Sequence, residues 1–142
     1  MAVTPVTPAD RARWDGQAIR DGASVAVLFA VPFTIIARLA FDDDDKSGWA
    51  SVLALASFLG FVLGAGVAAW RQRRGAPLSH GVVTAVGVFV IVQTLFAVIR
   101  VAGGNSLNVG KIVVSLSLTA LAGLLGGLLG SFLQRQGMAP RR

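Results

Sequence analysis

The chain of 142 residues contains no cysteine, a single histidine and only seven acidic residues. The absence of cysteine excludes a disulfide, a thiol nucleophile and a thiolate metal site. The lone histidine, His80, stands just before an apolar run, where it is more typical of an interfacial or capping residue than of a metal ligand or proton relay. No acid lies within the long apolar runs, so serines there have no base to activate them. We expect no enzyme activity, no cofactor and no metal.

The composition is too apolar for an ordinary soluble domain, with 54% hydrophobic residues and a mean hydropathy of +0.70. A net charge of +6 could indicate nucleic acid binding. However, the arginines form short clusters between apolar runs, which is typical of charges that fix topology beside anionic lipid. We therefore predict the lipid bilayer as a partner and no nucleic acid.

Four apolar runs are each close to the roughly 20 residues that cross a bilayer, over residues 23–41, 49–70, 81–102 and 112–133. They predict an all-α membrane protein with four transmembrane helices in an up-down bundle. Residues 1–22 are expected to form a cytoplasmic tail or a short interfacial helix from about Pro8 to Asp21, and residues 134–142 a basic cytoplasmic tail. Pro32 lies inside the first run, where we expect a kink near Thr34 rather than a break.

The basic residues are distributed unequally between the two sides of the predicted bundle. Nine lie before the first run, between the second and third, or after the fourth: Arg11, Arg13, Arg20, Arg71, Arg73, Arg74, Arg135, Arg141 and Arg142. Four lie on the other side: Arg38, Lys46, Arg100 and Lys111. Because basic residues concentrate on the cytoplasmic side, this bias places both termini in the cytoplasm.

Small residues recur at four-residue steps in the second and fourth runs. The fourth carries Ser115, Thr119, Gly123, Gly127 and Ser131 beside a row of Ala122, Gly126 and Gly130, and the second carries Ala56, Gly60, Gly64 and Ala68. Such rows let helix backbones approach closely in lipid. They predict either packing of the second helix against the fourth within one chain or a face that binds another chain. The predicted packing residues are Gly60, Gly64, Ser115, Thr119, Gly123, Gly126, Gly127 and Gly130.

Charged residues gather at the side opposite the termini. The predicted outer charge cluster consists of Arg38, Asp42, Asp43, Asp44, Asp45, Arg100 and Lys111. One interpretation is a charged vestibule for an anion or a substrate headgroup. The alternative, which we favour, is that the arginines extend to the interface and pair with the aspartates. The consecutive aspartates lack the ligand spacing of a calcium loop.

Gln93 and Thr34 are the polar side chains that we single out within the membrane. Such residues usually form hydrogen bonds across a helix interface. We favour this packing role for Gln93 over contact with a substrate.

Two segments of the chain resemble each other at an offset of 62 residues. Arg38 aligns with Arg100, and the ending Gln72-Arg73-x-Gly75 aligns with Gln134-Arg135-x-Gly137. This pattern raises the possibility of two parallel-repeated helical hairpins, related by an axis along the membrane normal.

The segment Arg74–Gly81, Gln93, Arg100 and the glycine block Leu124–Ser131 carry a likeness to a known group. In these residues the chain resembles small four-span membrane proteins of actinobacteria and other Gram-positive bacteria. The resemblance implies a bacterial plasma-membrane location and a short cytoplasmic loop between the second and third helices. It implies no chemistry for any position.

Two functions are compatible with these patterns. The first is a non-enzymatic membrane protein that acts through helix packing, as a homo-oligomer or as an accessory subunit of a larger complex. The second is a small dimeric transporter or channel with a polar path near Gln93 and the outer Arg38 and Arg100.

Overall fold

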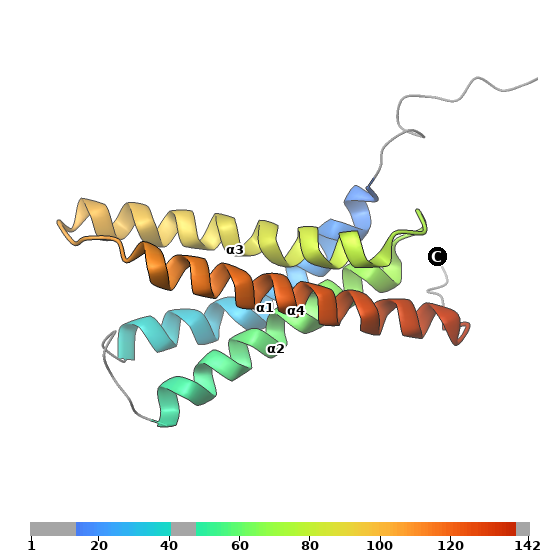
Figure 1. The fold of residues 1–142 in the computed structure, drawn as a ribbon, viewed down its shortest axis with the longest axis horizontal. Helices are drawn as coiled ribbons and strands as arrows, with labels where there is room; N and C mark the ends of the chain where they lie inside the picture. Colours follow the sequence, from blue (N-terminus) through green and yellow to red (C-terminus); the bar gives the residue numbers. More distant parts are fainter. Residues whose placement is uncertain (1–13, 41–47, 139–142) are drawn as a thin grey trace, which may run out of the picture.

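A computed structural model describes residues 14–40 and 48–138, which form four α-helices and no strand. The helices are α1 (Gly16–Ala40), α2 (Gly48–Arg71), α3 (Pro77–Ala102) and α4 (Val109–Arg135) (Figure 1). All four are long and apolar enough to cross a membrane. The predicted all-α bundle of four membrane-spanning helices is therefore confirmed.

The start of α1 differs from the sequence prediction. Asp15 precedes the helix, and its Oδ1 accepts hydrogen bonds from the backbone N–H groups of Gln17 and Ala18 at 3.2 Å each. This is the N-cap arrangement that satisfies the first free donors of a helix. Residues 16–22 therefore belong to α1, which corrects the predicted boundary between residues 22 and 23, while the expected tail or short helix before Trp14 stays a prediction. Residues 1–13 lie outside the described part of the chain.

Pro32 does not break α1, which runs without interruption to Ala40. The hydroxyl of Thr34 donates to the carbonyl of Ala30 at 2.9 Å, in the turn that contains the proline. The prediction that α1 continues past Pro32 is confirmed.

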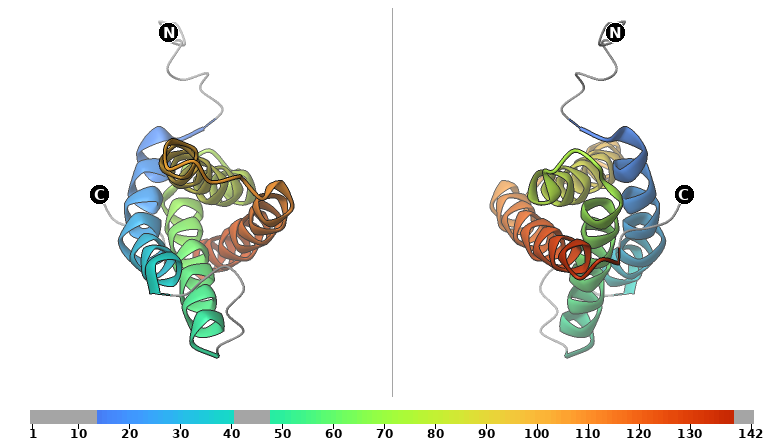
Figure 2. Two further views of the ribbon diagram at one scale, coloured as in Figure 1. Left: turned by 90° about the vertical axis from the view of Figure 1, so that its left-hand side faces the viewer. Right: turned by 90° about the vertical axis from the view of Figure 1, so that its right-hand side faces the viewer.

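Successive helices run antiparallel, so the bundle has two distinct ends (Figure 1). The closed end contains the starts of α1 and α3 and the ends of α2 and α4. The open end contains the ends of α1 and α3 and the starts of α2 and α4, and there the α1–α2 pair diverges from the α3–α4 pair (Figure 1). Within the described residues α1 and α4 do not touch, and Figure 2 shows them on opposite sides of α2.

Small side chains are buried and large apolar side chains are exposed, which is the reverse of a water-soluble bundle. Among the residues whose burial the structure describes, the buried hydrophobic ones are all alanines apart from Phe61 and Val88. Helix α4 buries only small residues and exposes Leu121, Leu125 and Leu128. Large apolar residues at the surface cost free energy in water but not against lipid tails, so this distribution fits a bundle embedded in a bilayer.

The small-residue row of α2 packs against α1. A Cβ placed on Gly64 would lie 2.6 Å from the Cβ of Ala26 and 2.7 Å from the carbonyl oxygen of Gly22. Likewise, a Cβ on Gly60 would lie 2.7 Å from the backbone nitrogen of Ala30. The predicted packing of the second helix against the fourth does occur, but the row of α2 itself meets α1, which supplies its own small residues at matching positions.

The two rows of α4 contact two different helices. A Cβ on Gly130 would lie 2.6 Å from the Cβ of Ala69 on α2, and Gly126 lies against the same helix. Gly123 and Gly127 instead face α3, where a Cβ on Gly123 would lie 2.8 Å from the Cα of Val82. Helix α4 thus packs closely on both neighbours through adjacent glycine rows.

The internal repeat is visible in the turns that follow α2 and α4. Gly75 and Gly137, 62 residues apart, both adopt positive φ values, 73° and 75°. The packing of the two hairpins is not symmetric, however, because α2 contacts α3 whereas α4 does not contact α1 in the described residues.

Candidate functional site: a polar cavity at the open end

Two adjoining cavities of about 440 Å³ and about 190 Å³ lie at the open end. They share Arg38, Gln93, Lys111 and Ser115 in their walls, so we describe them as one open-end cavity. All four helices contribute to its lining. The larger part alone falls within the size range of small-molecule sites.

The wall of the larger part is mixed in character. Its polar residues besides the shared ones are Thr34, Ser57 and Thr119. Its larger apolar residues are Val31, Phe58, Phe61, Phe89, Val92 and Leu118. The hydroxyls of Thr34 and Ser57 lie 3.2 Å apart, within hydrogen-bonding distance across α1 and α2. A site of this kind combines apolar contact area with a few convergent polar groups.

Arg38 and Gln93 form a direct contact between α1 and α3. Nη2 of Arg38 donates to Oε1 of Gln93 at 2.8 Å, and the guanidinium carbon lies 4.4 Å from the ring centroid of Phe96. The ring face attracts the cation, and the amide fixes its direction. The predicted hydrogen bond of Gln93 across a helix interface is confirmed. The same two side chains also line both parts of the cavity.

The smaller part of the cavity brings together the bases of the outer charge cluster. Arg38, Arg100 and Lys111 all line it. Nε of Arg100 donates to the carbonyl of Ser106 at 3.1 Å. The side chain of Asn108 caps α4 by accepting from the backbone N–H of Lys111 at 3.0 Å, so Lys111 lies in the first turn of the helix.

The acidic half of the predicted cluster, Asp42, Asp43, Asp44 and Asp45, lies outside the described residues. The predicted pairing of Arg38 and Arg100 with these aspartates therefore stays a prediction. What the structure adds is that the three bases meet at the mouth of one cavity.

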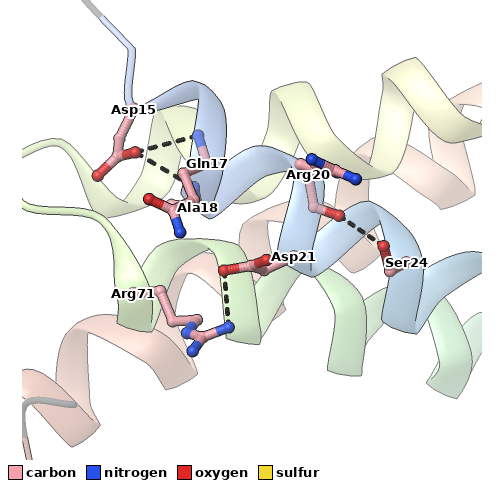
Figure 3. A network of polar contacts seen from close by, with 7 residues as sticks. All are labelled: Asp15, Gln17, Ala18, Arg20, Asp21, Ser24 and Arg71. Atoms are coloured by element: carbon pink, nitrogen blue, oxygen red, sulfur yellow. Dashed lines mark hydrogen bonds and ion pairs between the residues drawn. The ribbon is translucent and has the colours of Figure 1, made fainter. Parts of the chain in front are cut away.

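Polar contacts at the closed end have a structural role. Nη1 of Arg71 lies 2.6 Å from Oδ2 of Asp21 and joins α2 to α1 (Figure 3). His80 is fully buried, and its Nε2 accepts from the backbone N–H of Asp15 at 2.8 Å. Its Nδ1 lies 2.7 Å from the carbonyl of Ala76, to which it donates. Both ring nitrogens thus have partners, as expected for a capping residue.

Gln134 is a closed-end residue whose role the sequence did not reveal. Its Nε2 lies within hydrogen-bonding distance of three carbonyls at the end of α2, those of Ala69, Trp70 and Gln72, at 3.1, 2.8 and 2.9 Å. It thereby caps the last turn of α2 from α4. The alignment of Gln134 with Gln72 in the internal repeat was the one signal that could have singled it out.

The predicted packing residues divide between two regions. Gly60, Gly64, Gly123, Gly126, Gly127 and Gly130 lie in contacts between helices of the same chain. Ser115 and Thr119, which continue the row of α4 toward the open end, instead line the cavity. The same row of α4 therefore packs against a neighbouring helix toward the closed end and lines the cavity toward the open end.

Within the described residues, no group of three or more histidine, cysteine or acidic side chains could hold a metal ion. Comparison with protein-family models, with curated proteins and with solved structures finds no match for this chain. The resemblance to small four-span bacterial membrane proteins accordingly stays a prediction.

Proposed function

We propose that this protein is a non-enzymatic integral membrane protein that binds a small ligand in the open-end cavity, in the class of small transporters and substrate-binding membrane proteins. The observation that supports this most is the convergence of Arg38, Gln93 and the Thr34–Ser57 pair on a cavity of about 440 Å³. Polar and charged groups within membrane spans are costly, and they commonly mark ligand or ion pathways.

The bias of the basic residues supports an orientation for the cavity. The nine-to-four distribution favours a closed end at the cytoplasm and an open end at the exterior of a bacterial plasma membrane. The cavity would then receive its ligand from outside the cell or from the outer leaflet.

The close packing of the closed end argues for a binding cavity rather than a continuous pore. Around Gly126 and Gly130 the backbones of α2 and α4 leave no room for a Cβ. A path to the cytoplasm would require these helices to separate. A transport cycle would therefore move one hairpin against the other about this contact.

Assembly through the small-residue rows receives less support. The glycines of these rows face neighbouring helices within one chain, so they offer no groove to a second chain. The surface of α4 that remains exposed carries leucines suited to contact with lipid.

Labelling of introduced cysteines tests the proposal, and the natural absence of cysteine gives no background. Thr34→Cys and Gln93→Cys should react with a membrane-impermeant maleimide added outside intact cells. Val90→Cys, whose side chain lies on the exposed apolar surface of α3, serves as the control and should stay unlabelled. Protection of both cavity positions from water would overturn the proposed cavity function, and labelling from the cytoplasmic side alone would overturn its orientation.

A further inference from the structure

His80 is a buried titratable side chain that joins the two hairpins at the closed end. Its Nε2 lies 2.8 Å from the backbone nitrogen of Asp15, at the start of α1. Its Nδ1 lies 2.7 Å from the carbonyl oxygen of Ala76, the N-cap residue of α3. The imidazole therefore ties the hairpin of α1 and α2 to the hairpin of α3 and α4.

The two partners of the ring fix its protonation. The backbone N–H of Asp15 can only donate, so Nε2 must present a lone pair and carry no proton. The carbonyl of Ala76 can only accept, so Nδ1 must carry the single proton of the ring. In this arrangement His80 is a neutral imidazole in one tautomer. A second proton would have to bind at Nε2, where it would point at another donor.

We infer that His80 is a proton-binding site whose occupation releases the start of α1 from α3 and loosens the closed end. An imidazolium has two donors and no acceptor, so a proton taken up from solvent at Nε2 breaks the hydrogen bond with Asp15. It also places a positive charge on a side chain that is fully buried. Because the released arrangement accepts this proton and the closed one does not, acid favours release. The contact between the hairpins carries this inference, which stands independently of the proposed function.

The carboxylate of Asp15 does not remove the conflict. Its Oδ1 accepts from the backbone N–H groups of Gln17 and Ala18 at 3.2 Å each and caps α1 (Figure 3). If this carboxylate turned to accept from a protonated Nε2, the cap would be lost and the first turn of α1 would loosen. Separation from α3 and loss of the cap both weaken the start of α1.

The other charged side chains that the structure describes at the closed end add no second acid to this contact. Nη1 of Arg71 lies 2.6 Å from Oδ2 of Asp21, so that acid already has a partner on α2. Exposed bases come from α1, from the turn between α2 and α3, and from the end of α4: Arg20, Arg73, Arg74 and Arg135. Bases thus outnumber acids among the described residues at this end, which opposes a further positive charge while the end stays closed.

Thr84 adds a second polar group to the same face of α3. Residues four apart share a helix face, so Thr84 lies one turn deeper than His80. Its side chain is 1% exposed, and its hydroxyl has no hydrogen-bond partner among the described residues. A buried polar group without a partner is costly, and separation of the two helix starts brings this hydroxyl closer to water. The closed arrangement therefore depends all the more on the contact that His80 makes.

Nitrogen NMR of the single histidine tests the protonation directly. Protein made with isotope-labelled histidine and a histidine-free affinity tag is studied in maltoside micelles between about pH 8 and about pH 5, the range in which histidine ordinarily changes charge. At the alkaline end we expect a protonated Nδ1 and an unprotonated Nε2, which the chemical shifts of the two nitrogens distinguish. At the acid end we expect both nitrogens to carry protons.

Spin labels on two introduced cysteines measure the separation of the helices in the same pH range, since the chain has no cysteine of its own. Gln17→Cys lies in the first turn of α1 and Gly87→Cys on α3, both at exposed positions. Double electron–electron resonance should give a longer and broader distance distribution at the acid end. His80→Gln offers an amide oxygen to the N–H of Asp15 and does not titrate, so it should remove this response. Asp21→Asn, which removes the neighbouring acid, should keep it.

Several results would overturn the inference. If Nε2 stays unprotonated at the acid end, His80 is not a proton-binding site. If the ring gains a proton while the distance distribution stays the same, its charge does not act on α1. A pH response that persists in His80→Gln, or that disappears in Asp21→Asn, would assign the response to another group. Labelling of Thr34→Cys and Gln93→Cys tests the cavity separately, so either proposal can fail without the other.

Discussion

Replacing Gly64 by alanine should destabilise the bundle, although alanine is the better helix former. The added Cβ would lie 2.6 Å from the Cβ of Ala26 and 2.7 and 2.8 Å from backbone atoms of Gly22 and Ala26. Overpacking of this kind costs about 1–3 kcal/mol, and the upper part of that range applies because backbone atoms cannot rotate away. The higher helix propensity of alanine offsets about 1 kcal/mol of this cost. We therefore expect the free energy of unfolding to fall by about 1–2 kcal/mol.

Gly87→Ala on α3 is the matched control, because nothing lies within 4 Å of the position that its Cβ would occupy. It makes the same chemical change in a helix interior without a clash, so the free energy of unfolding should stay the same or rise. Both variants can be compared by reversible unfolding in mixed micelles of maltoside and SDS, followed by circular dichroism. Equal stabilities of Gly64→Ala and Gly87→Ala would refute the argument that α1 and α2 meet backbone to backbone.

Three further substitutions test the closed end by the same unfolding assay. Gln134→Ala removes the donor that contacts three carbonyls of α2 and should cost about 1–3 kcal/mol, whereas Gln136→Ala, on an exposed residue, should cost much less. Asp21→Asn should cost at most about 1 kcal/mol, with a smaller loss at high salt, because the side chains of Arg71 and Asp21 are 41% and 27% exposed. His80→Ala should cost about 1–3 kcal/mol because it leaves a cavity and a backbone donor without its acceptor; a loss near zero would contradict the capping role.

The spans and their antiparallel order could be predicted because hydrophobic length and loop length determine them. Over the residues that the structure describes, each of the four runs found in the sequence lies within a helix, with α1 beginning earlier, at Gly16. That difference arose because Arg20 and Asp21 interrupt the apolar pattern, although Asp21 meets Arg71 across the helix pair.

Which small-residue row contacts which helix could not be predicted. The rows of α2 and α4 have the same spacing, and α1 carries a third in Gly22, Ala26 and Ala30. Spacing alone does not rank such pairings, since any two rows allow close approach. Which rows pair depends on how the helices are placed and shifted along one another in the folded bundle.

The cavity was predicted only in part. Gln93, Thr34 and the bases stood out because polar residues are rare in apolar runs. Ser57 and Phe96 did not, since serine and phenylalanine are common in membrane helices and their contacts lie 23 and 58 residues away in sequence, at Thr34 and Arg38. The joining of these groups into one cavity depends on the divergence of the two hairpins, for which a single sequence contains no signal.

The central claim is that small residues hold these helices together while large apolar residues face lipid. The most direct test is the unfolding free energy of a variant in which Leu121, Leu125 and Leu128 of α4 are all replaced by alanine. Their side chains are 47%, 43% and 53% exposed. We predict that the unfolding free energy falls by less than about 1 kcal/mol for each leucine replaced, because lipid or detergent surrounds these side chains in the folded and unfolded states alike. A loss of about 2–5 kcal/mol for each, as in a buried core, would contradict the claim.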